Sequence, residues 1–295
     1  MGPPPRLSCV SCFERLGPAK KKRTKTVSLL AAISLAAILL SAPACTVLRE
    51  QPPAVPMCRI FTCEEDGIIR GRTDRREMAL IFTGGDFADG GPHIRRVLAR
   101  RRIKAGFFFT GDFYRNPENK ELITGLHSDG HYLGPHSDKH LLYCDWADRA
   151  KTLVTRDDFR RDILANYRVM EEFGLKKDES RIFIPPYEWY NRKVAGWAEE
   201  LGLVIFNFTP GTSSNADYTT PSMPEYLGSQ AIYDKVLKYE QTDPLGFNGF
   251  ILLIHIGTAP ERTDKFYDRL NDLLEYLTAK GYRLVRIDEL LDPGR

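Results

Sequence analysis

Short apolar runs alternate with longer amphipathic stretches from Met78 onwards, and this alternation constrains the fold more than any other feature of the sequence. In the longer stretches, apolar residues recur at three- and four-residue spacing, as at Phe159, Ile163, Tyr167 and Met170, which predicts amphipathic helices. Strands that alternate with helices are typical of a parallel sheet in an α/β fold. The number of repeats allows this sheet to close into a barrel.

The expected strands are short, and the expected helices lie between them. Strands are predicted at 78–82, 105–110, 131–133, 181–184, 204–208, 249–255 and 283–287. Helices are predicted at 92–101, 117–128, 156–174, 190–201, 228–240 and 262–280. In barrels of parallel strands, functional side chains gather where the strands end and the following loops begin.

Residues 1–44 have the composition of an export signal. A basic cluster that ends at Lys25 precedes the uncharged run 27–40, which is shorter than the ~20 residues needed to span a membrane. Small residues then precede Cys45, and the segment loosely resembles a bacterial lipoprotein signal. We expect export to the periplasm or the cell surface, with a lipid anchor at Cys45. Ordinary secretion after cleavage at the same bond and an uncleaved anchor are the alternatives.

Residues 45–75 are interrupted by prolines and are interpreted as a linker and lead-in to a domain at 76–295. In an oxidising compartment Cys58 and Cys63 can pair across a short loop, which would leave Cys144 free; whether they pair stays open. Without the signal the chain has 35 basic and 38 acidic residues, and it has no basic patch with interleaved aromatic residues. This balance argues against a nucleic-acid partner.

Two of the six histidines, His136 and His140, lie four residues apart directly after the expected strand 131–133. In a helical turn this spacing puts both side chains on one face, where two imidazoles can bind one metal ion. Taken alone, the pair fits equally well with two polar histidines on a loop.

Polar residues also follow other expected strands, at the edge where functional side chains gather. In chain order, these residues are Asp86, Glu188, Thr209 and His255. Aromatic residues, Tyr187 and Trp189 among them, crowd the same loops, and their faces suit both sugar rings and ordinary packing. The pattern predicts one site at one rim of the barrel.

These motifs resemble those of polysaccharide deacetylases of carbohydrate esterase family four, over about 78–291. The segment His136-Ser137-Asp138-Lys139-His140 matches the His-Ser/Thr-x-x-His segment of that family, and Leu252-Leu253-Ile254-His255 is similar to its Leu-Leu-His segment. The run 105–111 is similar to the second strand of the family. The resemblance implies a distorted (β/α)7 barrel. It also implies a metal-dependent deacetylase that removes acetyl groups, N-acetyl more than O-acetyl, from a cell-surface or environmental polysaccharide.

The resemblance also assigns roles to single residues. The expected ligands of one divalent ion, with Zn²⁺ as the default, are Asp86, His136 and His140. The expected general acid is His255. The expected contacts to the acetylated glycan are Tyr187, Trp189 and Thr209.

Two departures from the family pattern concern the general base. The family has paired aspartates after its first strand, whereas this chain has Gly85-Asp86, so the residue that acts as base is missing. Ile184 stands where the family has the arginine that orients the base. Asp89 and Glu188 are the candidates for a replacement, and a rival alignment makes Asp89 a metal ligand instead. Two other functions therefore stay open: a catalytically weak carbohydrate-binding protein on the same scaffold, and another metal-dependent amidohydrolase that acts on non-peptide C–N bonds.

Overall fold

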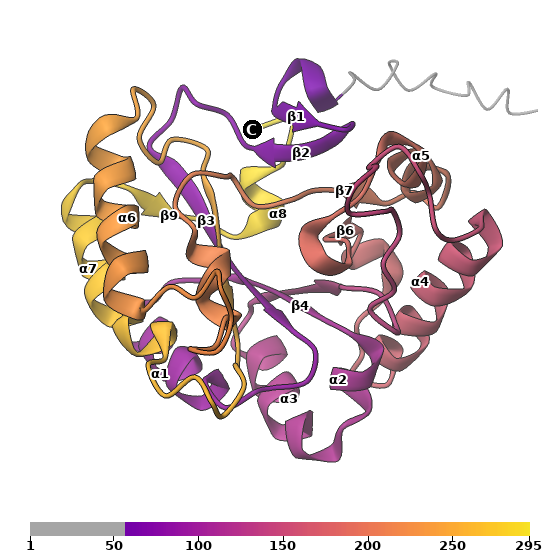
Figure 1. Cartoon of the computed structure of the whole chain (residues 1–295), viewed down its shortest axis with the longest axis horizontal. Coiled ribbons are helices and arrows are strands. Elements are labelled where there is room, and N and C mark those ends of the chain that lie inside the picture. Colours follow the sequence, from indigo (N-terminus) through magenta and orange to yellow (C-terminus); the bar gives the residue numbers. More distant parts are fainter. Residues whose placement is uncertain (1–56) are drawn as a thin grey trace, which may run out of the picture. The chain divides into compact units, whose positions relative to one another are not determined.

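The structure, a computed structural model, describes residues 57–295 (Figure 1). The expected signal segment, 1–44, and the expected lipid site at Cys45 lie outside the described residues. None of the helices within 57–295 combines the length and the apolar character that crossing a bilayer requires.

A parallel sheet built around β3 (Glu77–Gly84) forms the centre of the fold. β3 pairs with β4 (Gly106–Phe109) on one side and with β8 (Ile251–His255) on the other, and β5 (Tyr132–Pro135) extends the sheet beyond β4. β9 (Arg283–Leu284) pairs with the start of β3, and β6 (Ile182–Phe183) and β7 (Val204–Ile205) form a separate parallel pair. The α/β fold and its distorted barrel are confirmed. Each expected strand is present, although the fourth, fifth and seventh are shortened to two residues.

Helices surround the sheet on the outside (Figure 1). The six expected helical regions correspond to α1 (Gly91–Arg101), α3 (Lys120–Ser128), α4 (Arg156–Glu171), α5 (Arg192–Glu200), α6 (Ser229–Thr242) and α7 (Leu270–Ala279). The short helices α2 (Gly111–Arg115) and α8 (Ile287–Leu290) were not expected. α4 illustrates why the sequence signal works. Thr155 and Asp158 form a capping box at its start, and Phe159 and Ile163 are buried on its inner face.

Alternate residues of each strand face different cores, as the two-residue period of a strand requires. In β3, Leu80 and Phe82 pack with residues of the surrounding helices, whereas Ile81 belongs to a second cluster inside the barrel. The rings of Phe108 and Phe206 lie 4.9 Å apart in this inner cluster. Side chains therefore fill the barrel interior.

Residues 57–75, which the sequence suggests as the end of the linker and the lead-in, are folded. β1 (Thr62–Glu64) and β2 (Gly67–Arg70) form an antiparallel hairpin. A disulfide bond joins Cys63 of β1 to Cys58, which precedes the hairpin. Backbone hydrogen bonds from Asn207 N to Ile68 O and from Gly71 N to Gly249 O, both 2.7 Å, place β2 between the end of β7 and the start of β8. The hairpin thus fills a gap in the barrel wall.

Candidate active site

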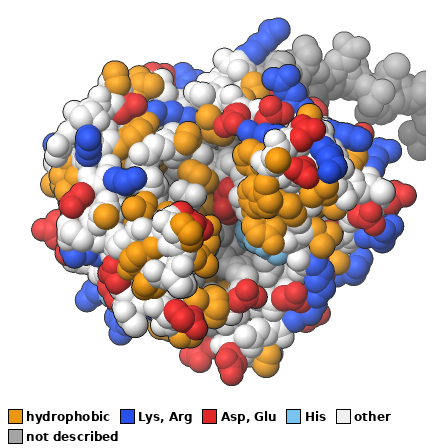
Figure 2. All heavy atoms as spheres, viewed as in Figure 1, with side chains coloured by type: hydrophobic (Ala, Val, Ile, Leu, Met, Phe, Trp, Pro, Cys, Tyr) orange, Lys and Arg blue, Asp and Glu red, His pale blue; other side chains and the backbone are white. Residues whose placement is uncertain are grey.

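A cavity of about 860 Å³ opens at the carboxyl ends of the parallel strands. Its lining comes from the ends of β3 and β8, from the loops that follow β5 and β6, and from the 3-10 helix η5 (Ser214–Tyr218). Figure 2 shows this hollow in the centre of the molecule, with histidine at its base and hydrophobic side chains beside it. The cavity lies at the rim that the sequence pattern predicts.

His136 and His140 converge in this cavity, but they do so on a loop and not on the expected helical turn. Ser137 and His140 have positive φ angles of 67° and 53°, and the Ser137 hydroxyl accepts a hydrogen bond from His140 N. The Nε2 atoms of the two imidazoles are 3.2 Å apart. His136 Nδ1 donates to the carbonyl oxygen of Ile184 at 2.9 Å, so the lone pair of its Nε2 is available to a ligand.

Both imidazoles are held in the neutral form that metal binding needs. Burial lowers the pKa of His136 well below its ordinary value, and the neighbouring His140 lowers it further. Burial also lowers the pKa of His140 to about 4, aided by His255 and opposed by the charge of Asp86.

The long helix α4 positions the histidine loop through two buried polar residues that sequence reasoning missed. Asn166 accepts a hydrogen bond from His136 N at 3.0 Å. Asp162 accepts from Asp138 N at 3.1 Å and from the Tyr143 hydroxyl at 2.8 Å. Both lie on the helix face that also carries buried apolar residues. The sequence signal that could have identified them is the presence of two polar residues within the apolar face of this helix.

The imidazole pair fits one metal ion, whereas the expected third ligand is not brought against it. Two ligands at ~2.0–2.1 Å from a tetrahedral ion lie about 3.3 Å apart, close to the observed Nε2 separation. Asp86 lines the same cavity at the end of β3. In the described part of the chain, however, no three side chains of His, Cys, Asp or Glu are gathered closely enough to hold a cation.

His255 ends β8 and is paired with a carboxylate that the sequence did not reveal. Asp217 in η5 is fully buried, and it accepts hydrogen bonds from His255 N at 2.9 Å and from His255 Nδ1 at 2.6 Å. Burial lowers the pKa of His255, but the charge and the hydrogen bond of Asp217 outweigh it, so the net pKa is raised. This arrangement leaves Nε2 free and stabilises an imidazolium, as a general acid requires.

Glu188 lies in the cavity beside the histidine pair. Its Oε1 is 3.9 Å from His136 Nε2. Burial raises the pKa of Glu188 to about 7, partly opposed by His255. Tyr187 and Glu188 have positive φ angles of 58° and 53°, a conformation that costs on the order of 1 kcal/mol or more for a residue with a side chain and that clusters at functional sites.

Ile184 and Gly85 occupy the positions at which the family pattern has arginine and the first aspartate. Ile184 is fully buried in the apolar cluster inside the barrel. A Cβ atom added at Gly85 would have its nearest neighbour, Thr110 Cγ2, at 3.7 Å, which is ordinary van der Waals contact. The position at 85 therefore has room for a side chain.

Asp89, an expected general base, is placed elsewhere and is not part of the cavity lining. Its carboxylate accepts from Thr258 N at 2.9 Å and from the Tyr267 hydroxyl at 2.6 Å, and it pairs with Lys265 at 3.0 Å. Burial raises the pKa of Asp89, but these donors outweigh burial and lower it. Asp89 thus fixes the loop after β8, and the rival alignment that made it a metal ligand is also unsupported.

Of the expected substrate contacts, only Tyr187 lines the cavity, with its ring 4.3 Å from the ring of His140. Trp189 lies outside the lining, and its indole nitrogen donates to Asp145 O at 3.2 Å. Thr209 is buried and structural, because its hydroxyl donates to Ile69 O at 2.6 Å, next to the hairpin.

Comparisons with known proteins find similar sequences among polysaccharide deacetylases. The polysaccharide deacetylase family model matches residues 70–206. The chain is 26% identical to a chitin deacetylase of Colletotrichum lindemuthianum over 90% of this chain and 94% of the relative. It is 26% identical to a peptidoglycan-N-acetylglucosamine deacetylase of Bacillus cereus over 72% of this chain and 87% of the relative. An uncharacterized protein of Bacillus subtilis, YlxY, is 25% identical over 81% of this chain, which spans 65% of that relative.

The fold is shared with a solved structure from Bacillus anthracis that is described as a pseudoenzyme of carbohydrate esterase family four. The TM-score is 0.61 at 19% identity, and the match covers 78% of this chain and 70% of that protein. A mutant of that pseudoenzyme is described as having restored enzymatic activity. The family-model match over residues 70–206 and the shared fold make the chain similar to polysaccharide deacetylases of carbohydrate esterase family four, and together they support a divergent member of that family.

Proposed function

We propose that the protein is a metal-dependent deacetylase that hydrolyses acetyl groups, N-acetyl more than O-acetyl, on a cell-surface or environmental polysaccharide. The observation that carries this proposal is the meeting of three groups in one cavity. These groups are the imidazole pair of His136 and His140, His255 with its hydrogen-bond partner Asp217, and the mostly buried Glu188. Related proteins that act on chitin or on peptidoglycan support a glycan substrate.

Each group has a role in amide hydrolysis. A divalent cation, Zn²⁺ by default, would be held by His136 and His140 with Asp86, and when bound it supplies Lewis acidity and a more acidic water. Glu188 accepts a proton from the attacking water, since its raised pKa suits a base near neutral pH. His255 donates a proton to the leaving amine, and Asp217 holds the imidazole in position throughout.

Glu188 takes the place of the missing first aspartate. The family pattern puts the base at the end of β3, where this chain has Gly85, whereas Glu188 approaches from the loop after β6. The arginine that orients the family's base is also absent, because Ile184 contributes to the core instead. Both departures are consistent with one change, in which the base moved from one loop to another.

A screen for acetate release from chitooligosaccharide, peptidoglycan and acetylated xylan tests the proposal. His136→Ala should remove both bound metal and activity. Glu188→Gln should lower kcat roughly 10²-fold and leave the metal content unchanged. Adding Gly85→Asp to Glu188→Gln should restore part of kcat, because position 85 has room for a carboxylate.

The results separate the possible roles of Glu188. Loss of metal in Glu188→Gln would make Glu188 a ligand and not the base. If the wild type releases no acetate from any substrate, the second candidate, a carbohydrate-binding protein, is favoured instead. Two observations support this candidate: glycine replaces the first aspartate at position 85, and the fold is similar to that of a pseudoenzyme.

We further propose that the protein acts outside the cytoplasm, with lipid attached at Cys45. The disulfide bond between Cys58 and Cys63 supports an oxidising compartment. Mass spectrometry of the amino-terminal peptide from membrane fractions tests the anchor. A mature chain that starts at another residue would contradict it.

A further inference from the structure

Exposed apolar side chains in residues 57–295 are concentrated at the cavity. Eight large hydrophobic side chains are exposed in this part of the chain, and five of them line the cavity: Phe87, Trp146, Tyr187, Tyr218 and Met223. Figure 2 shows hydrophobic side chains on both sides of the hollow. Apolar side chains gathered at one opening, and not scattered over the surface, mark a binding site.

Aromatic rings lie next to two of the site histidines, His140 and His255. The ring of Tyr187 is 4.3 Å from the ring of His140, and the ring of Tyr218 is 5.3 Å from the ring of His255. Trp146 extends this surface outward, since its ring meets that of Tyr187 edge-on at 5.6 Å. The Trp146 side chain is 59% exposed, more than any other large hydrophobic residue in the described part of the chain.

The exposed indole of Trp146 is held in place by the side chains beneath its other face. It stacks on Trp189, with the ring centres 5.6 Å apart and the planes at 25°. The guanidinium of Arg149 lies 4.3 Å from the centre of the Trp189 ring on which Trp146 stacks, and Arg149 donates to Tyr190 O at 2.6 Å. Arg149 also pairs with Glu64 of the amino-terminal hairpin. A large ring that is held rigidly loses little conformational freedom when a ligand stacks on it.

The charges of the lining favour an uncharged ligand. The lining contains no arginine, and its one lysine, Lys139, pairs with Asp112 at 2.5 Å. Asp86 and Glu188 add carboxylates deeper in the cavity. A chain of carboxylated or sulfated sugars would therefore find no free cation among the lining side chains.

We propose that Trp146 is a stacking platform for a second sugar ring, so that the cavity selects an uncharged N-acetylhexosamine chain over a single sugar. This inference rests on the proposed function and specifies its substrate class. With the acetyl group of one residue between His140 and His255, the neighbouring residue extends past Tyr187 and its apolar face covers the Trp146 indole.

Chain-length dependence tests the platform. In the wild type, kcat/KM for acetate release should rise from the single sugar N-acetylglucosamine to chitin oligosaccharides, with the first increase at the disaccharide. Trp146→Ala should raise KM for the disaccharide and the pentasaccharide about tenfold, with kcat and the kinetics of the single sugar unchanged, and Trp146→Phe should recover most of the loss. Leu153→Ala is the matched control, because Leu153 is 45% exposed but does not line the cavity. Equal Tm values for the four proteins exclude a folding defect.

Calorimetric binding of the pentasaccharide to Glu188→Gln, with and without Trp146→Ala, separates this inference from the proposed function. Weaker binding in the double variant supports the platform even if no acetate is ever released. Equal binding overturns it, and so does an unchanged KM in Trp146→Ala. Tighter binding of glycan strands that carry N-acetylmuramic acid than of the chitin pentasaccharide overturns the preference for an uncharged chain.

Discussion

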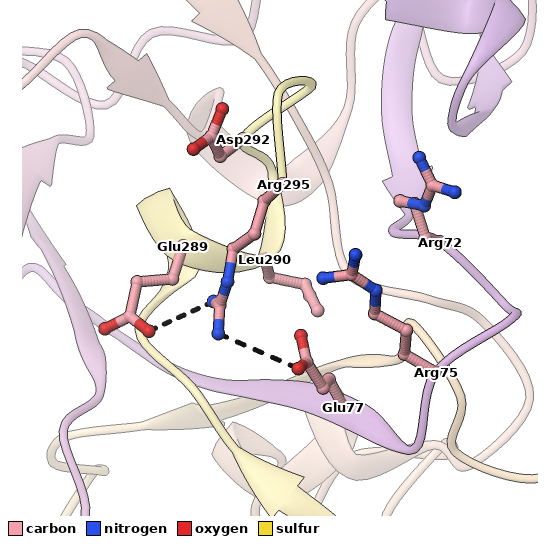
Figure 3. Close-up of a pocket in the computed structure, with 7 residues that line it drawn as sticks. All are labelled: Arg72, Arg75, Glu77, Glu289, Leu290, Asp292 and Arg295. Carbon is pink, nitrogen blue, oxygen red and sulfur yellow. Dashed lines mark hydrogen bonds and ion pairs between the residues drawn. The ribbon is translucent and has the colours of Figure 1, made fainter.

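The two ends of β3 differ in how the charged side chains near them are paired. At its start, Glu77 joins a cluster that also includes Glu289 and Arg295, and the cavity there is only about 10 Å³, room for a single water molecule (Figure 3). The Arg295 guanidinium lies 3.1 Å from Glu289 and 3.7 Å from Glu77. At the other end of the strand, the large cavity contains the mostly buried Glu188, whose side chain is 13% exposed and has no cationic partner among the described lysines and arginines.

This difference separates stabilising charges from functional ones. Paired charges at the amino end of the strands hold the carboxyl terminus against the sheet. At the carboxyl end, burial without full pairing raises the pKa of Glu188, and the buried hydroxyl of Thr83 has no hydrogen-bond partner. Such groups reduce stability, and they persist at sites where chemistry needs them.

Asp217→Asn should produce the largest effect and affect only the carboxyl end. The amide can no longer stabilise the imidazolium of His255, so kcat should fall roughly 10³-fold. Stability at pH 7 should change little, because Asn retains an oxygen that accepts from His255 N. Kinetics and urea unfolding measure both quantities. A large stability loss with unchanged kcat would show that Asp217 is structural.

His131→Asn tests a buried ionisable group at the amino ends of the strands. His131 immediately precedes β5, and it is buried without an ion-pair partner among the described residues. Its Nδ1 accepts from Ala105 N at 3.1 Å, and burial, with Lys104, lowers the pKa of His131 to about 4. Below pH 6.5 the unfolded chain binds a proton there and the native chain does not. The wild type should therefore lose stability, by about 3 kcal/mol at most, as pH falls from 6.5 to 4.

Asn can accept the same hydrogen bond but does not titrate, so the variant should lack this part of the pH dependence. Urea unfolding of both proteins at pH 7.5 and pH 4.5 isolates the contribution from those of the site histidines. Parallel pH profiles for the two proteins would contradict the assignment.

Arg295→Ala should have the smallest effect. Its ion pairs are partly exposed, and pairs of this kind contribute under about 1 kcal/mol. Thermal unfolding should shift by a few degrees at most, and acetate release should not change. A loss of activity in this variant would break the separation between the two ends of β3.

The sequence predicted the barrel well because its signals are local. Apolar periodicity identifies α4 whatever surrounds it, and the apolar runs of β3 and β8 reflect burial on both faces. β2 was missed because its run, Gly67–Arg70, is only four residues long, and its place in the barrel depends on partners far along the chain.

The site was predictable only where a motif carries it. The spacing of His136 and His140 identified the pair, although the loop that joins them is not helical. Asp217 carries no local signal, because its partner His255 is remote in sequence. Asp89 was misplaced for the same reason: proximity in sequence to Asp86 says nothing about Tyr267, which holds it elsewhere.

The position of β2 also bears on how the molecule assembles. The first strand of the barrel to leave the ribosome completes its backbone pairing only with Asn207 and Gly249, which are made much later. Such distant contacts slow folding, since a long loop must be ordered before they form. Until then, the unpaired edges beside the gap are open to other chains, which makes the incompletely folded chain prone to aggregation.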